Sequence, residues 1–332
     1  MVKVGLLGAG FMGSAHAAAY TAIENAHLVA VADVDHAAAD KLAEEQGAKA
    51  YYEIESLVKD REIDMVDVCL PTFLHERSVV SAAKRGKHVL CEKPIALILE
   101  QVDSMISAVR EAGVMAMVAQ VVRFWPQYVV IREMFERGEL GKPLMARAAR
   151  LVGPPDWSSW FKDPGLSGGA LLDLHIHDLD YIYSLFGKPR SVYAVGATSE
   201  TGAWDYVVTS LDYGDKRAVA EASFLMPKGF PFQTAFRLLG TDGCAEYRFR
   251  VGGQVDRREA AEMEFTLYRS NQPPEHPPSP DKDAYEAEIE YFVNCVSQGQ
   301  EPEIATLEEA RIVLQIALAA RESLETGQVV EL

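Results

Sequence analysis

The sequence is poor in cysteine. It has only four, Cys69, Cys91, Cys244 and Cys295, and none of them belongs to a Cys-x-x-Cys pair. This scatter gives no disulfide framework, so we expect buried free thiols, as at Cys69 and Cys91, which fall at the ends of predicted strands.

Positive charge and long apolar runs are scarce as well. Against 49 acidic residues there are 32 Lys and Arg, which gives a net charge of −17. So acidic a chain repels phosphate backbones and anionic lipids, and we expect neither nucleic acid nor a membrane as a partner. No apolar span is long enough to cross a bilayer, and the N-terminus lacks a signal-peptide pattern, so the expected location is the cytoplasm.

The remaining composition is that of a soluble globular protein. Apolar residues make up 48% of the chain and charged residues 24%, which provides ample material for a core. A length of 332 residues suggests two domains.

The first fifteen residues hold the clearest motif. The apolar run Val2 to Leu7 leads into Gly8-Ala9-Gly10-Phe11-Met12-Gly13 and then into the small-residue stretch Ser14 to Ala19. A strand, G-x-G-x-x-G and a helix in this order are typical of a dinucleotide-binding turn. Gly8 permits the turn, Gly10 lets backbone approach a pyrophosphate, and Gly13 lets the helix pack on the strand. The alternative is that the glycines only serve a tight turn.

A carboxylate follows at the expected distance. The predicted second strand, His27 to Val31, ends just before Asp33, which can accept hydrogen bonds from an adenosine ribose and would repel a 2′-phosphate. No arginine stands in the residues directly after Asp33. We therefore predict NAD rather than NADP as the cofactor.

Residues 1–119 alternate short apolar strands with helices, which predicts a doubly wound parallel sheet of the Rossmann type. Further strands are expected at Ala48 to Tyr51, Met65 to Cys69, His88 to Cys91 and Met115 to Ala119, with helices at Thr72 to Arg85 and Leu97 to Ala112. Ligands of such sheets bind beyond the carboxyl ends of the strands. The residues at two of these ends are Pro71, Thr72 and His75, and Glu92, Lys93 and Pro94. His75 could equally be a helix-start residue without a chemical role.

The pattern of longer, alternating segments in residues 120–332 predicts a second, α+β domain with a large open sheet that is antiparallel or mixed. After a mainly helical stretch, Val121 to Gly138, strands are expected at Leu144 to Leu151, Ser191 to Ala197, Tyr206 to Asp212, Ala218 to Phe224, Gln233 to Gly240, Cys244 to Arg250 and Met263 to Ser270. Two helices close the chain, Asp283 to Val296 and Leu307 to Thr326.

One helix, predicted over Ala170 to Tyr181, carries the remaining chemistry. Asp173 and His177 are four residues apart and would share a helix face, where a carboxylate can orient an imidazole that serves as general base. The alternative is a core histidine satisfied by Asp173 or Asp180. Asp173, His175 and His177 are all residue types that can bind a metal ion. No metal site is expected, however, because the helical period turns His175 about 200° away from both Asp173 and His177.

Together these motifs resemble the Gfo/Idh/MocA family of NAD(P)-dependent oxidoreductases. The resemblance covers nearly the whole chain and includes the glycine turn, Asp33, Glu92-Lys93-Pro94, Arg123-Phe124-Trp125-Pro126 and the Asp173/His177 pair. It implies a Rossmann domain and a domain whose open sheet commonly serves as an oligomer interface, hence a homodimer or homotetramer. Many members have a small residue where this chain has His175, which could reach the substrate if the helix began later.

The resemblance also implies roles for individual residues. Lys93, Asp173 and His177 match the family's catalytic residues, and the nicotinamide is expected near Thr72 and Lys93. The implied substrate is a polyol, cyclitol or sugar, oxidised at a secondary hydroxyl. Arg123 could hold the substrate or pair with a helix carboxylate. The aromatic residues Trp125, Trp157, Trp160 and Phe161 could stack on a sugar ring or pack under a loop.

Two other classes of function stay open. One is an enzyme, a hydrolase or lyase, that keeps NAD tightly bound and uses transient oxidation. The other is a non-catalytic protein that senses NAD(H).

Overall fold

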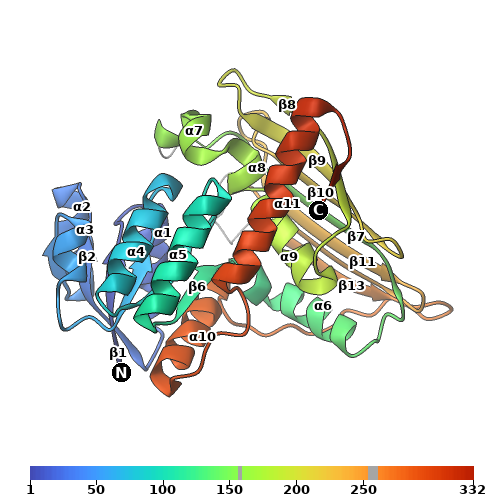
Figure 1. Ribbon diagram of the computed structural model, residues 1–332. Coiled ribbons are helices and arrows are strands. Elements are labelled where there is room, and N and C mark those ends of the chain that lie inside the picture. The colour runs from blue at the N-terminus through green and yellow to red at the C-terminus, as the bar shows by residue number, and fades with distance from the viewer. Residues whose placement is uncertain (156–158, 253–260) are drawn as a thin grey trace. The chain divides into compact units, whose positions relative to one another are not determined.

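The computed structural model describes residues 1–155, 159–252 and 261–332 (Figure 1). The chain forms two compact units. The first comprises Met1–Phe124 and Lys282–Arg311, and the second comprises Trp125–Asp281 and Ile312–Leu332. A segment near the C-terminus therefore belongs to the first unit, and the first division of the chain falls at Phe124.

The first unit holds a six-stranded sheet in the order β3-β2-β1-β4-β5-β6. All neighbouring strands are parallel, which confirms the predicted doubly wound sheet. The order reverses between β1 and β4, the point at which such sheets bind ligands. The strands are β1 (Val2–Leu7), β2 (Ala26–Ala32), β3 (Lys49–Tyr51), β4 (Met65–Val68), β5 (His88–Glu92) and β6 (Ala116–Ala119).

Helices cover this sheet, and every residue of β4 and β6 is buried, as expected for strands with both faces covered. Helix α1 packs against α10, and α4 packs against α5. Phe292 and Val293 of α10 share one apolar core with Val4 and Leu6 of β1. The helices are α1 (Phe11–Tyr20), α2 (His36–Gln46), α3 (Ile54–Val58), η1 (Thr72–Leu74), α4 (His75–Lys84), α5 (Leu99–Ala112), η2 (Val121–Phe124) and α10 (Ala284–Gln298).

The second unit is built on an eight-stranded sheet in the order β13-β12-β11-β7-β10-β9-β8-β14. Its neighbouring strands are antiparallel apart from the central pair β7 and β10, which is parallel. The predicted large, mixed sheet is confirmed. The strands are β7 (Pro143–Leu151), β8 (Ser191–Thr198), β9 (Trp204–Asp212), β10 (Arg217–Ser223), β11 (Phe232–Gly240), β12 (Cys244–Val251), β13 (Ala261–Tyr268) and β14 (Val330–Glu331).

Side chains alternate between the two faces of this sheet. On one face, Ala146 and Ala148 of β7 are fully buried, where α6, α8 and α9 contact the strands. On the other, which we call the open face, Arg147 is exposed and faces Glu221 of β10. The helices of this unit are α6 (Pro126–Glu136), η3 (Ser159–Lys162), α7 (Pro164–Ser167), α8 (Gly169–Asp173) and α9 (Ile176–Phe186), and α11 (Leu307–Thr326) belongs to it from Ile312 onward.

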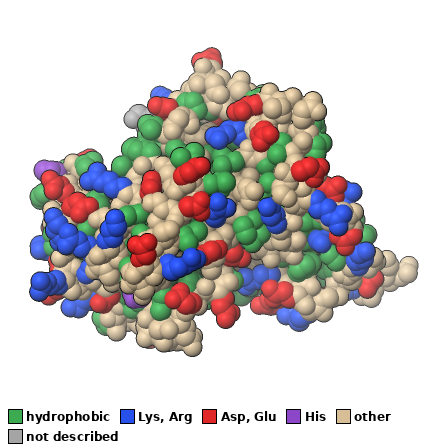
Figure 2. All heavy atoms as spheres, viewed as in Figure 1, with side chains coloured by type: hydrophobic (Ala, Val, Ile, Leu, Met, Phe, Trp, Pro, Cys, Tyr) green, Lys and Arg blue, Asp and Glu red, His purple; other side chains and the backbone are tan. Residues whose placement is uncertain are grey.

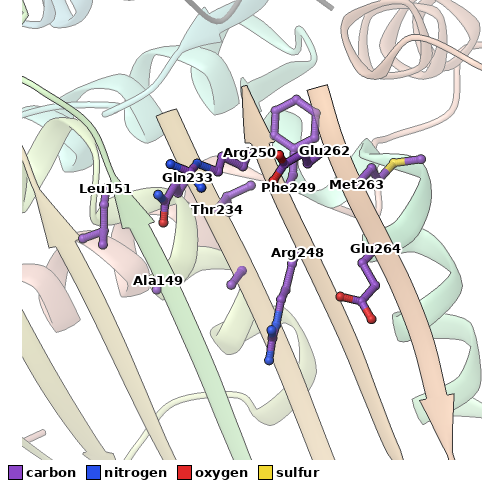
Figure 3. Close-up of a pocket in the computed structure, with 11 residues that line it drawn as sticks. Ala149, Leu151, Gln233, Thr234, Arg248, Phe249, Arg250, Glu262, Met263 and Glu264 are labelled. Atoms are coloured by element: carbon purple, nitrogen blue, oxygen red, sulfur yellow. The ribbon is translucent and has the colours of Figure 1, made fainter. Parts of the chain in front are cut away.

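A hollow of about 340 Å³ lies on the open face (Figure 3). Its charged lining comes from two adjacent strands, since Arg248 and Arg250 of β12 stand opposite Glu264 and Glu262 of β13. Among the residues that the structure describes, none of those expected at the active site lines this hollow.

The surface carries mixed charge in spite of the acidic total. Acidic and basic side chains are interspersed on the side of the molecule shown in Figure 2. Within the described residues, no helix combines the length and apolarity that crossing a membrane requires.

Candidate active site

The glycine turn has the geometry that the motif predicts. Gly8 has a φ of +100°, and a Cβ there would lie 2.3 Å from the carbonyl oxygen of Cys69. A Cβ on Gly13 would lie 1.9 Å from the carbonyl oxygen of Gly8. Gly10, in contrast, has no atom within 4 Å of its Cβ direction. The turn therefore leaves backbone accessible at Gly10, as a dinucleotide pyrophosphate requires.

Helix α1 begins directly after Gly10, which has no side chain to cap it. The positive end of a helix dipole is thus available to phosphate groups. Phe11, the first residue of this helix, is largely exposed, whereas Gly13 is buried. The residues present therefore fit the pyrophosphate of a dinucleotide.

Asp33 follows β2 and is fixed beside the same turn. Its Oδ2 accepts a hydrogen bond from the backbone N–H of Ala9 at 2.7 Å, and its Oδ1 accepts one from Asp35 at 2.8 Å. Each carboxylate oxygen can accept a further hydrogen bond. The carboxylate is therefore held in place while it keeps capacity for a ribose hydroxyl.

His75 ties together the two loops that carry the other predicted cofactor residues. It is buried at the start of α4, with Nε2 2.8 Å from the carbonyl oxygen of Leu70 and Nδ1 3.0 Å from that of Pro94. Burial lowers the pKa of this imidazole. Because Leu70 follows β4 and Pro94 follows β5, His75 connects the loops after these two strands. Pro71 and the buried Thr72 lie between Leu70 and His75 in the sequence.

Lys93 lies directly after β5 and is half-buried. Its backbone N–H donates to Glu92 Oε2 at 2.9 Å, and its peptide bond to Pro94 is cis. Glu92 is itself buried. The structure therefore places Lys93 at the carboxyl edge of the parallel sheet, the edge that also carries the glycine turn.

Arg123 lies in η2 and is only 2% exposed. It donates to Glu309 of α11 at 2.7 Å, so the expected pairing with a helix carboxylate is present. A contact between Arg123 and substrate stays a prediction.

The aromatic residues considered for stacking on a sugar ring have different surroundings. Trp125 precedes α6, and its ring lies within 6.3 Å of the rings of Tyr128, Tyr247 and Phe249. This places Trp125 in an aromatic cluster of the second unit. Trp160 stacks on Phe161 with ring centroids 4.1 Å apart, whereas Trp157 lies outside the described residues.

The predicted helix over Ala170 to Tyr181 is wrong. The structure has two helices, because α8 ends at Asp173 and α9 begins at Ile176. At the junction, the N–H groups of Leu174 and His175 both donate to the carbonyl oxygen of Ala170. Asp173 and His177 thus belong to different helices, and the argument from a shared helix face does not apply to them.

His175 lies at this break and contacts the sheet. Its Nε2 lies 2.8 Å from Oγ1 of Thr209 in β9, and the side chain is fully buried. Burial lowers the pKa of His175 to about 3, so the imidazole is neutral. The imidazole is directed at β9, and a contact between His175 and substrate stays a prediction.

Three polar contacts fix the junction around His177. Asp205 of β9 accepts a hydrogen bond from the N–H of Ala170 at 2.9 Å, and Thr209 holds His175. Arg150 of β7 binds both carboxylate oxygens of Asp178, at 3.0 and 3.2 Å. His177 is half-buried between two fully buried neighbours in sequence. The sheet thus sets the position of the backbone that carries the predicted general base.

The chain matches two family models. Residues 2–120 match the oxidoreductase family with an NAD-binding Rossmann fold, and residues 128–246 match the GFO/IDH/MocA C-terminal domain. It is also 30% identical to scyllo-inositol 2-dehydrogenase (NAD(+)) of Bacillus subtilis, with 100% of this chain and 96% of the relative covered.

The chain belongs to the Gfo/Idh/MocA family of oxidoreductases.

A further relative and a solved structure are similar to this chain over most of its length. D-xylose 1-dehydrogenase (NADP(+)) 2 of Haloferax volcanii is 32% identical over 91% of both chains. The crystal structure of an NAD binding oxidoreductase from Klebsiella pneumoniae is 26% identical and has a TM-score of 0.82, with 99% of this chain and 98% of that chain covered. The resemblance seen in the sequence motifs is confirmed.

Sequence reasoning missed two groups of buried charges in this family member. One is His16 on α1 with Asp67 in β4, and the other is Arg150 with Asp178. A signal was present in the first case, because Asp67 interrupts the apolar strand Met65–Val68 and His16 follows the glycine turn in a stretch of small residues. A charged residue in such a segment predicts a buried partner, but it does not say which one.

Proposed function

We propose that the protein is an NAD-dependent dehydrogenase that oxidises a secondary hydroxyl of a polyol, cyclitol or sugar. The observation that carries this proposal is the placement of Lys93 at the carboxyl edge of a parallel sheet that also bears an uncapped, ligand-accessible glycine turn. The names of the relatives, which are inositol and xylose dehydrogenases, support the substrate class.

The reaction needs a group for the hydroxyl proton and a group for the developing alkoxide. In this proposal His177 accepts the proton as general base. The family resemblance pairs it with the carboxylate of Asp173 at the end of the preceding helix. The Lys93 ammonium donates a charge-assisted hydrogen bond to the alkoxide oxygen. NAD, held by the Gly8 to Gly13 turn and by Asp33, supplies the acceptor for the carbinol hydride. The reverse reaction uses the same groups in the opposite direction.

Substrate and cofactor can be tested in one screen. We expect an absorbance increase at 340 nm with NAD and a subset of inositols, aldoses or sugar acids. If protein shown separately to bind NAD gives no signal with any of them, the dehydrogenase proposal fails in favour of NAD(H) sensing. If product forms with no net reduction of NAD, it fails in favour of a hydrolase or lyase with tightly bound cofactor.

We propose NAD rather than NADP because Asp33 is anchored beside the glycine turn. A 2′-phosphate would meet its negative charge, and no arginine follows to compensate. In the same screen NAD should exceed NADP by about tenfold or more in kcat/KM, which corresponds to about 1.4 kcal/mol. Equal use of both cofactors would refute the role of Asp33.

We also propose the cytoplasm as the location. The four free thiols are compatible with such a reducing compartment.

We also propose that the open face binds a second copy of the chain, giving a homodimer or homotetramer. Tyr193, Val195, Leu239 and Tyr268 are each at least 40% exposed and lie on this face by the alternation of their strands. Exposed apolar residues on an extended sheet are typical of protein interfaces. Light scattering should give a dimer or tetramer mass, and a monomer at micromolar concentration would contradict the proposal.

A further inference from the structure

A buried cluster of charges lies behind the glycine turn. His16 of α1 is fully buried, and its Nδ1 lies 2.9 Å from Oδ2 of Asp67 in β4. Its Nε2 lies 3.2 Å from Oε1 of Glu92, the last residue of β5. The imidazole is therefore hydrogen-bonded to a carboxylate of β4 and lies at ion-pair distance, without hydrogen-bond geometry, from a carboxylate of β5.

The surroundings of His16 favour its charged form. The Tyr20 hydroxyl donates to Asp67 Oδ2 at 2.9 Å, and Cys69 Sγ lies 3.4 Å from His16 Nδ1. From α10, the ring of Tyr285 packs at 5.9 Å, and the fully buried Glu288 of the same helix acts electrostatically on Tyr285. Carboxylates thus face the imidazole from β4 and β5.

Burial by itself lowers the pKa of His16, but the Asp67 carboxylate, Cys69 and their hydrogen bonds more than offset it. The pKa of His16 is therefore raised well above its ordinary value, which favours the imidazolium between the two carboxylates. Two carboxylates buried without a cation would be costly, because an unpaired buried charge is poorly solvated.

The cluster leads directly to Lys93. Oε1 of Glu92 faces His16, and Oε2 of the same carboxylate accepts the backbone N–H of Lys93 at 2.9 Å. His16 is on the helix that begins at the glycine turn. A single carboxylate therefore connects that helix to the backbone of the proposed active-site lysine.

We propose that His16 is a positioning residue for Lys93: its imidazolium, carried on the cofactor-binding helix, fixes the Glu92 carboxylate, which in turn fixes the Lys93 backbone. This inference rests on the proposed function, since it needs Lys93 to take part in turnover.

A metal ion is the alternative occupant of this cluster, because His16, Asp67 and Cys69 each place a possible ligand atom within 4.8 Å of the other two. We assign them to hydrogen bonds because the 2.9 Å separation of Nδ1 from Oδ2 is a hydrogen-bond distance.

The test compares His16→Gln with His27→Gln, a matched control at an exposed position of β2. His16→Gln should lower kcat by up to about 10²-fold, the effect of a small misplacement of a reacting group. The substrate KM and the Kd for NADH should change less than threefold, within about 0.7 kcal/mol. Glu92→Gln should reproduce the loss, and the double variant should be less impaired than the product of the two single effects.

The pH profile separates a charged His16 from a merely packed one. In the wild type, kcat should fall at alkaline pH as the His16 imidazolium and the Lys93 ammonium lose their protons, and His16→Gln should keep only the part of the fall that belongs to Lys93. A direct measurement on the folded wild type is the nitrogen NMR shift of the His16 imidazole, assigned by its loss in His16→Gln. The shift itself is measured on the wild type, and the variant serves only for the assignment.

Each outcome decides the matter. A neutral His16 imidazole at pH 7, a His16→Gln variant as active as His27→Gln, or stoichiometric metal whose removal abolishes activity would each overturn the inference. If the 340 nm screen stays blank, the proposed function itself fails, whereas full turnover in Lys93→Met removes Lys93 from the mechanism and with it the premise of this inference. If Lys93→Met is inactive while His16→Gln is not, only the inference fails.

Discussion

Lys93→Met should lower kcat by about 10²- to 10⁴-fold, the usual effect of removing a proton-transferring or charge-stabilising group. Methionine keeps the apolar stem but cannot donate a hydrogen bond to the developing alkoxide. The backbone contact to Glu92 uses the main-chain N–H and survives the substitution. The Kd for NADH, measured by fluorescence titration, should therefore stay close to that of the wild type.

The matched control for Lys93→Met is Lys84→Met, at an exposed position near the end of α4. It should keep wild-type kcat and KM. His177→Ala should show the same pattern as Lys93→Met, with turnover lost and cofactor binding retained. Near-full activity in Lys93→Met or in His177→Ala would remove that residue from the proposed mechanism.

Arg150→Met should destabilise the second unit by about 3 to 5 kcal/mol, because it leaves the carboxylate of Asp178 buried without its cation. Both residues are almost completely buried, and the guanidinium binds both carboxylate oxygens. Urea denaturation followed by circular dichroism measures the change in the free energy of unfolding. Activity should fall as well, because Asp178 fixes the backbone next to His177.

Two comparisons test the cause of this destabilisation. Arg147→Met, on the open face of the same strand and more than half exposed, should cost less than about 1 kcal/mol. Arg150→Met/Asp178→Leu should recover most of the loss, since it removes both charges. If the double variant is as unstable as Arg150→Met, the unpaired carboxylate is not the cause.

The pH dependence of Arg150→Met follows from the same carboxylate. Burial raises the pKa of Asp178, and in the wild type Arg150 opposes that shift. Without Arg150, the folded variant keeps a proton on Asp178 that the unfolded chain releases above its ordinary pKa. The variant should therefore lose stability relative to the wild type as the pH rises from about 4 toward neutrality.

Local sequence patterns were sufficient to predict most of the fold. Strand β1 has the predicted bounds, Val2–Leu7, because an apolar run ends directly at a glycine turn. Helix α11 also has its predicted bounds, Leu307–Thr326. Gly8, Gly10 and Gly13 have the expected geometry because their conformational demands arise within the motif itself.

The errors arise where distant residues decide the local structure. At the break between α8 and α9, His175 contacts Thr209 of the distant strand β9. Helical periodicity within residues 170–181 contains no information about that contact. In the same way, Arg123 pairs with Glu309, and His16 pairs with Asp67 and Glu92. In each case the charged residue is visible in the sequence, but its partner is set by the tertiary fold.

The position of α10 within the first unit has a consequence for biosynthesis. This helix supplies Ile289, Phe292 and Val293 to the core around β1, and the residues after it include Ala305, whose carbonyl oxygen accepts a hydrogen bond from Val118 in β6. Domains usually fold as units, in order, as the chain leaves the ribosome. Here the cofactor-binding unit stays incomplete until the strands of the second unit have been synthesised. A nascent chain that stops before Lys282 would therefore expose one face of the nucleotide-binding sheet, so chaperone dependence and degradation of truncated products are expected to centre on the N-terminal half.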